Sequence, residues 1–455
     1  MPLTLLVRCL LLVVATLAPG AMAATSERLL ANGLKVIVIE DHRAPTVAHM
    51  VWYRAGSIDE ENGRTGVAHV LEHLMFKGTR TMAAGEFSRR VAALGGRENA
   101  FTSRDYTGYF QQVHRDHLAE MMRLESDRMA NLVIGPQDFA PEIKVVMEER
   151  RLRTDDQPKA LARELLMATA FIASPTRTPV IGWMNDLVSM TVEDAQDWYR
   201  RWYAPNNAVL VVAGDVDPEA VFRLAESTYG RIPARALPQR KPQAEPEQRG
   251  TRRAVMRAPA ENPWVMIGFR APVLRDVERD EDPFALEVLS AVLDLDAVGR
   301  LARSLVRGQR IANQADAGYD MTSRGETLFL LSGTPAQGRT TEDLERALRE
   351  EVRRIADEGV TEEELRRIKT QYVAARTYQR DAVFAQAMEA AGLEVVGLSH
   401  RDADRILDRI GAVTAEQVRD VARRWFDQDR MTVVTLIPQP PGEARPPASR
   451  AAPRQ

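Results

Sequence analysis

The sequence predicts an α+β protein of two similar tandem domains, each an antiparallel-rich sheet covered by helices. Its 455 residues are many for one domain and suit two domains with separate cores. Strand-like and helix-like patterns occur in a similar order in both halves of the chain. The segment between the halves, from Pro233 to Arg253, is rich in Pro, Gln, Arg and Glu and lacks apolar periodicity, which is typical of a linker.

The overall composition is that of an ordinary soluble protein. Hydrophobic residues make up 45% of the chain and charged residues 27%, and the net charge is only −3. A balance so close to neutral, with the two signs interspersed, indicates no nucleic-acid partner. Cys9 is the only cysteine, and it lies in the N-terminal segment. The mature chain would therefore have neither disulfides nor a thiol nucleophile, and a metal would need His and carboxylate ligands.

The first 23 residues have the pattern of a secretory signal peptide. Arg8 supplies the positive charge, residues 9–18 are apolar, and Ala21-Met22-Ala23 is a small-residue cleavage motif. The apolar run is too short to span a membrane. We therefore expect cleavage after Ala23, a periplasmic or secreted mature chain, and no stable membrane insertion. An uncleaved anchor is the alternative.

Apolar patterns and turn signals predict the early elements of the first half. Two strands flank a turn that contains Pro45, and Gly95-Gly96 ends the second helix. In order, the predicted elements are strands at 35–40 and 47–53, helices at 66–75 and 85–94, strands at 99–103 and 106–113, and a helix at 117–131.

Start signals predict most of the later elements of this half. Pro141 fits the first position of a helix, and Thr191 with Asp194 has the spacing of a capping box before a helix to Trp202. Asp217 followed by Pro218 opens a helix to Tyr229. A helix at 160–172 and a continuous apolar strand at 208–213 complete the half.

The second half repeats this layout. The strand at 264–271 echoes the one at 47–53, and Thr322-Ser323-Arg324 echoes Thr102-Ser103-Arg104. Further elements are a strand at 255–256, helices at 283–293 and 341–357, a long helical stretch at 361–390, and a closing strand at 431–437. The predicted boundaries are a signal peptide at 1–23, a first domain at 24–235, a linker at 236–252, a second domain without metal residues at 253–438, and a disordered tail at 439–455.

One short motif carries the chemistry of the first half. His69 and His73 are four residues apart, so a helix would point both imidazoles at one spot, with Glu72 beside them. The pattern His-x-x-Glu-His is the reverse of the His-Glu-x-x-His zinc helix. Zinc binds neutral imidazole, and a nearby carboxylate can take a proton from the water that zinc acidifies. Glu72 is the candidate base. The alternative is a surface helix with scattered His and Glu.

A later helix offers a third ligand. Glu142 and Glu149 fall on an apolar face, where carboxylates are costly unless something pairs with them. The face consists of Glu142, Val145, Val146 and Glu149. Glu148 instead shares a face with Lys144 and Arg151, a spacing typical of an ion-paired surface. Periodicity thus favours Glu149 as the metal ligand, with Glu142 behind it. An amphipathic helix with a ragged edge is the alternative.

Together these motifs resemble the pitrilysin/insulinase-type zinc metallopeptidases, or inverted zincins. The short bacterial members, which are also similar to the mitochondrial processing peptidase, are the nearest in pattern. The resemblance covers nearly all of residues 27–437. It rests on Gly66 to Thr79, Asn99-Ala100-Phe101-Thr102, Glu142 with Glu149, Trp202 to Asn207, and Gly214-Asp215. It implies one zinc per chain on His69, His73 and Glu149, with Glu72 as general base and Glu142 as support.

The resemblance also implies how a peptide is held. A peptide would add as a strand to an exposed sheet edge near the metal, in contact with Asn99, Ala100 and Phe101. For Asn99, a simple turn residue is the alternative. The family's second domain usually supplies an Arg and a Tyr. Arg307 matches the Arg region, but Asn313 stands at the Tyr position. We therefore predict a heterodimer with a related chain that supplies this Arg/Tyr clamp across a closing cleft, in preference to a homodimer.

The sequence thus predicts an exported zinc endopeptidase that hydrolyses peptides or unfolded segments. Two other functions stay open. One is a non-catalytic structural or binding subunit of the same fold, against which the intact set of metal-site groups argues. The other is a peptidase dedicated to one precursor peptide. The signal peptide argues against a role of that kind in cytoplasmic biosynthesis.

Overall fold

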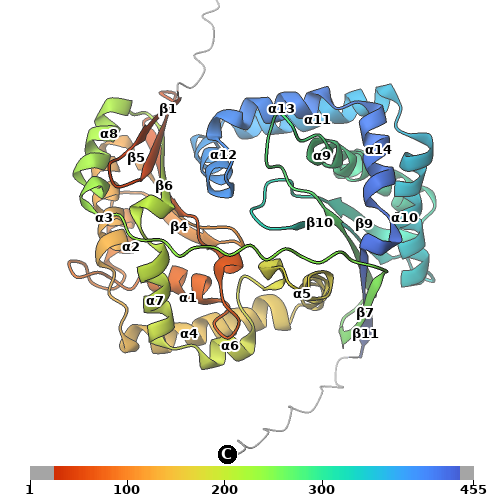
Figure 1. Ribbon diagram of the computed structural model, residues 1–455, viewed down its shortest axis with the longest axis horizontal. Helices are drawn as coiled ribbons and strands as arrows, with labels where there is room; N and C mark the ends of the chain where they lie inside the picture. The colour runs from red at the N-terminus through yellow and green to blue at the C-terminus, as the bar shows by residue number, and fades with distance from the viewer. Residues whose placement is uncertain (1–24, 441–455) are drawn as a thin grey trace, which may run out of the picture.

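Two sheets lie side by side in the computed structural model, which describes residues 25–440 (Figure 1). The first sheet has the order β1-β2-β6-β3-β5-β4, and the second has the order β7-β11-β8-β10-β9. The strands of the first are β1 (Thr25–Leu29), β2 (Lys35–Glu40), β3 (Thr46–Tyr53), β4 (Arg97–Thr102), β5 (Thr107–His114) and β6 (Ala208–Gly214). Those of the second are β7 (Arg252–Pro259), β8 (Trp264–Ala271), β9 (Ala312–Gly318), β10 (Thr327–Pro335) and β11 (Met431–Gln439).

The two sheets have the same topology apart from β1. Each has one parallel pair, β2 with β6 and β7 with β11, and its other pairs are antiparallel. In both, the last strand in sequence lies between the first two strands of the repeated unit, and one edge is left open at β4 or β9. The predicted α+β class with two similar, antiparallel-rich domains is confirmed.

Helices cover these sheets. In the first half they are α1 (Val67–Leu74), α2 (Glu86–Ala93), α3 (Leu118–Asn131), α4 (Pro136–Arg150), α5 (Pro158–Ala170), α6 (Met184–Ser189), α7 (Val192–Trp202) and α8 (Pro218–Ser227). In the second half they are α9 (Asp282–Leu293), α10 (Thr341–Glu358), α11 (Glu362–Gln379), α12 (Val383–Val396), α13 (Ala403–Ala412) and α14 (Ala415–Trp425). Thr191 and Asp217 cap α7 and α8 as their spacing predicts.

The halves interlock by exchanging one helix each. Helix α5 precedes the linker, yet its buried face packs on the second sheet through residues such as Leu166 and Phe171 against Trp264. Helix α12 belongs to the second half, between β10 and β11, yet Ala387 and Ala391 pack against the first sheet (Figure 1). Burial of both apolar faces therefore stabilises the arrangement of the two halves and not only each half alone.

Two helix predictions are wrong in detail. Helix α4 begins at Pro136, so Pro141 lies inside it; Pro136 already occupies the first turn, where proline costs no hydrogen bond. The stretch 361–390 is two helices, α11 and α12, separated at 380–382. The break lets α12 turn away toward the first sheet, which no local pattern shows.

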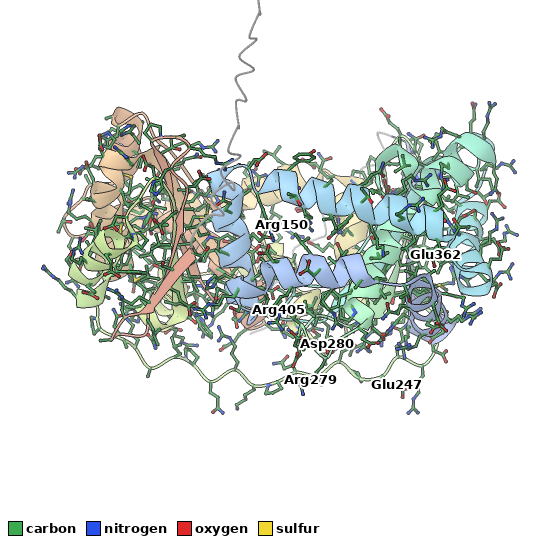
Figure 2. The ribbon with its side chains drawn as sticks, turned by 90° about the horizontal axis from the view of Figure 1, so that it is seen from above. Arg150, Glu247, Arg279, Asp280, Glu362 and Arg405 are labelled. Atoms are coloured by element: carbon green, nitrogen blue, oxygen red, sulfur yellow. The ribbon has the colours of Figure 1, made fainter. Side chains whose placement is uncertain are left out.

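An extended segment connects the halves. Residues 233–249 contain no helix or strand and run along one side of the molecule, where Figure 2 marks Glu247. The carboxylate of Glu245 fixes this segment by accepting hydrogen bonds from the backbone amides of Ile172, Ala173 and Ser174. The expected signal peptide and nearly all of the expected tail lie outside the described residues. In the described part of the chain, no helix combines the length and apolar character that crossing a membrane requires.

Candidate metal centre

Helix α1 begins at a left-handed glycine. Gly66 has a φ of 88°, and a Cβ there would come within 2.6 Å of the Ile181 carbonyl oxygen. The Glu60 carboxylate caps the helix by accepting from the amides of Gly66 (2.8 Å) and Ala68 (2.9 Å). Its buried residues are Val67, Ala68, Val70, Leu71 and Leu74. Burial of this face leaves the motif side chains at 69, 72 and 73 on the half-buried opposite face.

Three predicted ligands converge on one point. Oε2 of Glu149 lies 3.3 Å from Nε2 of His73 and 3.8 Å from Nε2 of His69. One ligand atom from each residue lies within 4.8 Å of the other two. Two imidazoles and one carboxylate form a donor set that zinc uses in catalytic sites. The residues present therefore fit a zinc ion.

Neighbouring side chains hold two of these ligands. Oε1 of Glu142 lies 2.8 Å from Nδ1 of His73, and its Oε2 lies 2.5 Å from Nζ of Lys77. Burial acts to raise the pKa of Glu142, but the hydrogen bonds from Lys77 and His73 lower it overall. Arg153 places Nη1 2.5 Å from Oε1 of Glu149. These contacts leave Nε2 of His73 and Oε2 of Glu149 facing the shared point.

His69 is suited to bind as a neutral imidazole. Burial, followed by the charges of His73 and Arg153, lowers the pKa of His69 to about 3. Its buried Nδ1 has no hydrogen-bond partner among the described residues. A neutral ring keeps Nε2 free to donate its lone pair, which metal binding requires.

Glu72 faces the same cavity and has no basic side chain at hydrogen-bond distance among residues 25–440. Its Oε2 accepts a hydrogen bond from Oγ1 of Thr102, at the end of the edge strand β4. Burial raises the pKa of the Glu72 carboxyl above its ordinary value, against the opposing effect of Thr102. A carboxylate with a raised pKa can accept a proton more readily and return it.

The cavity brings the edge strand to this centre. Its volume is about 610 Å³, and Asn99, Ala100 and Phe101 of β4 line it. Asn99 is exposed and accepts from the Ala100 amide, while the Phe101 ring packs on Trp52 with centroids 4.9 Å apart. No residue that lines this cavity lies beyond residue 181.

The residues predicted from the second half are not at the site. Arg307 is exposed, and its Nη2 donates to the Ala297 carbonyl at 2.6 Å. Asn313 is exposed on the edge strand β9. Tyr319 comes just after that strand, not within it, and its hydroxyl donates to the Pro272 carbonyl. Within one chain, the centre is built from the first half alone.

Sequence reasoning missed four supporting groups and misjudged one face. Arg153 follows Glu149 by four residues on the chain, a spacing that could have indicated their contact, whereas Lys77 contacts Glu142 across the fold. The role of Thr102 has no such signal, because it contacts Glu72 across the fold, and Glu60 reaches the start of α1 from six residues upstream, which is not a standard capping spacing. On α4, Val145 is 50% exposed, so the buried face passes through Glu142 and Val146, and Glu149 borders it. Glu148 pairs with Arg151 at 2.8 Å on the solvent side, as expected.

A second group of possible metal ligands is already occupied. Glu27, Glu394 and His400 lie close together, but Nζ of Lys35 lies 3.1 Å from Glu27 and 2.7 Å from Glu394. A cation at this position makes the group an ion-pair network that joins β1 and β2 to α12.

Comparison with known proteins identifies the family. Residues 35–182 match the model of Insulinase (Peptidase family M16), and residues 189–372 match Peptidase M16 inactive domain. The zinc protease PqqE of Helicobacter pylori is 30% identical over 417 residues, which are 90% of this chain and 92% of that protein. The chain belongs to the insulinase family of peptidases, M16. The resemblance inferred from its motifs is thereby confirmed.

Other relatives are similar over different lengths. The mitochondrial-processing peptidase subunit beta of Blastocladiella emersonii is 29% identical over 218 residues, 47% of each protein. The crystal structure of a protease from Helicobacter pylori superposes with a TM-score of 0.86 at 28% identity, covering 91% of this chain and all of that one. The periplasmic protease PqqL of Escherichia coli gives a TM-score of 0.76 at 18% identity, over 91% of this chain but 48% of that chain. This M16 chain therefore has the fold of about one half of PqqL.

Proposed function

We propose that this M16 chain is an exported zinc-dependent endopeptidase that hydrolyses peptides or unfolded segments. The observation that carries the proposal is the convergence of His69, His73 and Glu149 beside Glu72, in one cavity with the edge strand β4. The names of its relatives as zinc proteases support the same chemistry. One zinc per chain would bind to these two imidazoles and to Oε2 of Glu149. When bound, zinc supplies Lewis acidity, which lowers the pKa of water and polarises a carbonyl.

The chain's own groups would perform the proton transfers. Glu72 would take a proton from the attacking water and pass it to the leaving amine, for which its raised pKa is suited. Thr102 orients Glu72 through its hydroxyl. Glu142 and Arg153 act as positioning residues, because each holds a ligand on the side away from the shared point.

The edge strand would hold the substrate. Strand β4 pairs with β5 on one side only, so its other side can add a peptide backbone. Asn99, Ala100 and Phe101 line the cavity beside it and are the proposed contacts. An extended peptide suits this geometry, whereas a segment of a folded protein would have to unfold before its backbone could pair with β4.

A related chain would complete the site as a heterodimer. Arg307 and Asn313 belong to the second half, which contributes no residue to the cavity of the metal centre. The fold of one chain matches about half of PqqL, so two such chains would equal that longer protein. We propose that the partner's second half supplies the Arg/Tyr clamp. A homodimer would present Asn313 in place of the Tyr.

Export and domain boundaries are proposed from the sequence pattern. Cleavage after Ala23 would release a periplasmic or secreted chain with domains at 24–235 and 253–438. The exchange of α5 and α12 between the halves means that each proposed domain would lack one covering helix when expressed alone. Functional tests should therefore use the whole mature chain.

Cleavage assays with controlled metal content test the proposal. The purified mature chain, loaded with zinc, is assayed on fluorogenic unfolded peptides, alone and mixed with a related chain that carries the Arg and Tyr. We expect zinc-dependent cleavage that a chelator abolishes and that rises in the mixture. Equal rates with and without the related chain would disprove the heterodimer. Absence of cleavage in both would favour the non-catalytic subunit of the same fold, and cleavage of one precursor only would favour the dedicated processor.

A further inference from the structure

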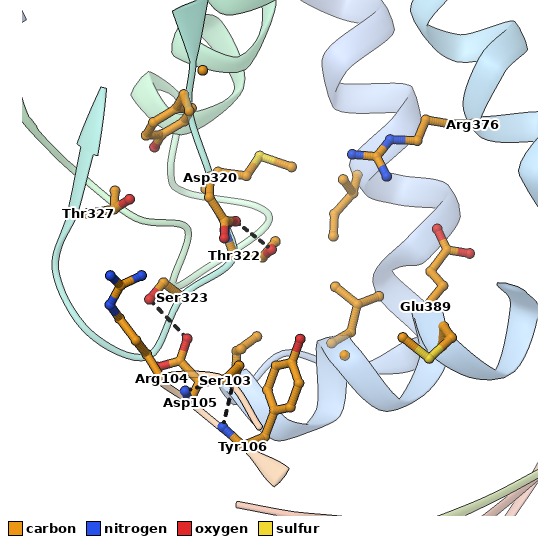
Figure 3. Close-up of a pocket in the computed structure, with 18 of the residues that line it drawn as sticks. Ser103, Arg104, Asp105, Tyr106, Asp320, Thr322, Ser323, Thr327, Arg376 and Glu389 are labelled. Atoms are coloured by element: carbon orange, nitrogen blue, oxygen red, sulfur yellow. Dashed lines mark hydrogen bonds between the residues drawn. The ribbon is translucent and has the colours of Figure 1, made fainter. Parts of the chain in front are cut away.

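The cavity of the metal centre adjoins a larger cavity between the two halves. The larger one has a volume of about 800 Å³ and is lined by residues from both halves. The two cavities share three lining residues, Arg104, Arg163 and Met167. Figure 3 shows Arg104 on one wall of the larger cavity, with Arg376 and Glu389 on the opposite side. Two cations therefore stand at the passage between the cavities.

Neither of these arginines has a carboxylate partner. The half-buried Arg104 donates from Nε to the Thr176 carbonyl at 3.3 Å, the only hydrogen bond of its side chain within residues 25–440. Arg163 is exposed on α5 and forms neither a hydrogen bond nor an ion pair with any described residue. Burial, and next the charge of Arg163, lower the pKa of Arg104, while Asp105 and Asp320 act in the opposite direction. The two positive charges thus act against each other where both side chains line the same two cavities.

Nearby carboxylates are already engaged elsewhere. Glu164, next to Arg163 in sequence, binds both terminal nitrogens of Arg150 at 2.9 Å. Asp105 accepts from Ser323 at 3.0 Å, as Figure 3 marks. Asp320 accepts from the backbone and side chain of Thr322. Because these groups have partners of their own, Arg104 and Arg163 keep their donors for a ligand.

The position of the pair relates it to a bound peptide. Glu72 contacts Thr102, and Arg104 follows Thr102 by two residues past the end of β4. A strand advances about 3.3 Å per residue, so a peptide paired with β4 would reach Arg104 within about three residues of its scissile bond. Guanidinium groups bind carboxylates in a planar, two-pronged geometry.

We propose that Arg104 and Arg163 bind a carboxylate of the peptide substrate close to the scissile bond. The carboxylate is either an Asp or Glu side chain or the C-terminal carboxylate of a short peptide. This inference rests on the proposed peptidase function and adds a substrate class to it. The pair determines which substrates bind, and for an internal Asp or Glu the larger cavity receives the part of the peptide that extends beyond that residue.

Binding measurements separate this inference from catalysis. The full mature chain with Glu72→Gln, loaded with zinc, is titrated with fluorescent peptides in matched pairs. In one series Glu replaces Gln at each position in turn; in the other, a free C-terminus replaces an amide. We expect one internal Glu, or the free C-terminus, to tighten binding roughly tenfold, the ordinary effect of a charged hydrogen bond. Equal Kd values within every pair would overturn the inference.

Substitutions assign the effect to the arginines. Arg163→Gln changes an exposed side chain, and we expect it to remove most of the preference for the carboxylate while leaving the Kd of the neutral peptides unchanged. Arg104→Lys keeps the charge and should reduce the preference by losing the two-pronged contact. Arg223→Gln, on α8 with a 68% exposed side chain, removes one charge elsewhere and should leave the preference intact. The assignment would be contradicted if Arg163→Gln weakened the binding of neutral and acidic peptides equally. It would also be contradicted if Arg223→Gln reduced the preference for the carboxylate as much as Arg163→Gln does.

The two proposals fail in different ways. If the chain with Glu72 intact cleaves no peptide but the Glu72→Gln variant still prefers acidic peptides through Arg163, the peptidase function is wrong and the carboxylate site stands. If the intact chain cleaves acidic and neutral peptides with equal kcat/KM and binds them equally, the carboxylate site is wrong and the peptidase function stands.

Discussion

Glu142 on α4 holds His73 on α1, with its Oε1 2.8 Å from Nδ1 of the imidazole. Its other oxygen lies 2.5 Å from Nζ of Lys77. With Nδ1 engaged, the ring presents Nε2, which lies 3.3 Å from Oε2 of Glu149. The contact therefore selects both the tautomer and the orientation of a proposed metal ligand.

Replacing Glu142 should weaken zinc binding without removing a ligand. In Glu142→Gln the side-chain amide can still contact His73. The substitution removes the negative charge of the carboxylate, which interacts with Lys77 and with the His73 imidazole. We expect zinc affinity to fall about 10- to 100-fold, as for other groups that hold ligands. Competition with a chromophoric chelator measures this. Glu148→Gln, six residues further along and paired with Arg151 at the surface, is the control and should bind zinc as the parent does.

Glu149 and Glu148 should differ in their effect on metal content. Glu149→Ala removes the only carboxylate of the cluster and should leave less than one zinc per chain after dialysis, with loss of activity. Glu148→Ala should retain one zinc and full activity, because its side chain points to solvent. Elemental analysis of both variants checks this, and circular dichroism confirms that each is folded. Equal zinc content in the two variants would exclude Glu149 as a ligand.

Acid should weaken the network that joins the halves. The carboxylate of Glu394, 6% exposed, lies 2.7 Å from Lys35 and 2.9 Å from Nδ1 of His400. Burial acts to raise the pKa of Glu394, but hydrogen bonds from His400 and Lys35 lower it to about 2 from 4.5. A depressed pKa stabilises the folded state above pH 4.5, and this stability is lost as the pH falls toward 2. The loss should be about 2–3 kcal/mol.

Unfolding by urea at several pH values tests this linkage. Between pH 5.5 and 3, the free energy of unfolding should fall less steeply in Glu394→Gln than in the parent. Glu416→Gln, whose side chain is 75% exposed, should follow the parent curve. If the slopes of the parent and Glu394→Gln coincide, Glu394 is not the group responsible.

Local patterns were sufficient for the elements that build the metal centre. The spacing of His69 and His73 placed both rings on one face of α1, and the paired surface position of Glu148 left Glu149 as the candidate ligand. The same reasoning placed Val145 in the core, where the structure leaves it exposed, because periodicity alone does not fix which edge of a helix meets a neighbour.

Contacts made across the fold could not be predicted from the sequence. Thr102 meets Glu72 because β4 lies beside α1, and Arg104 lines the same cavities as Arg163 because α5 packs on the second sheet. The exchange of α5 and α12 depends on which sheet each helix meets, and the apolar pattern of a helix does not specify its partner. The contact of Arg153 with Glu149 could have been predicted, since Arg153 follows Glu149 by four residues on the chain.

The role of Glu72 is tested most directly by measuring zinc content and turnover on the same samples of Glu72→Gln. The variant keeps the size of the side chain and its contact with Thr102, but cannot accept a proton. The account predicts one zinc per chain, as in the parent, and a turnover reduced about 10²- to 10⁴-fold. Loss of zinc would make Glu72 a ligand, and unchanged turnover with zinc bound would contradict its role as the general base.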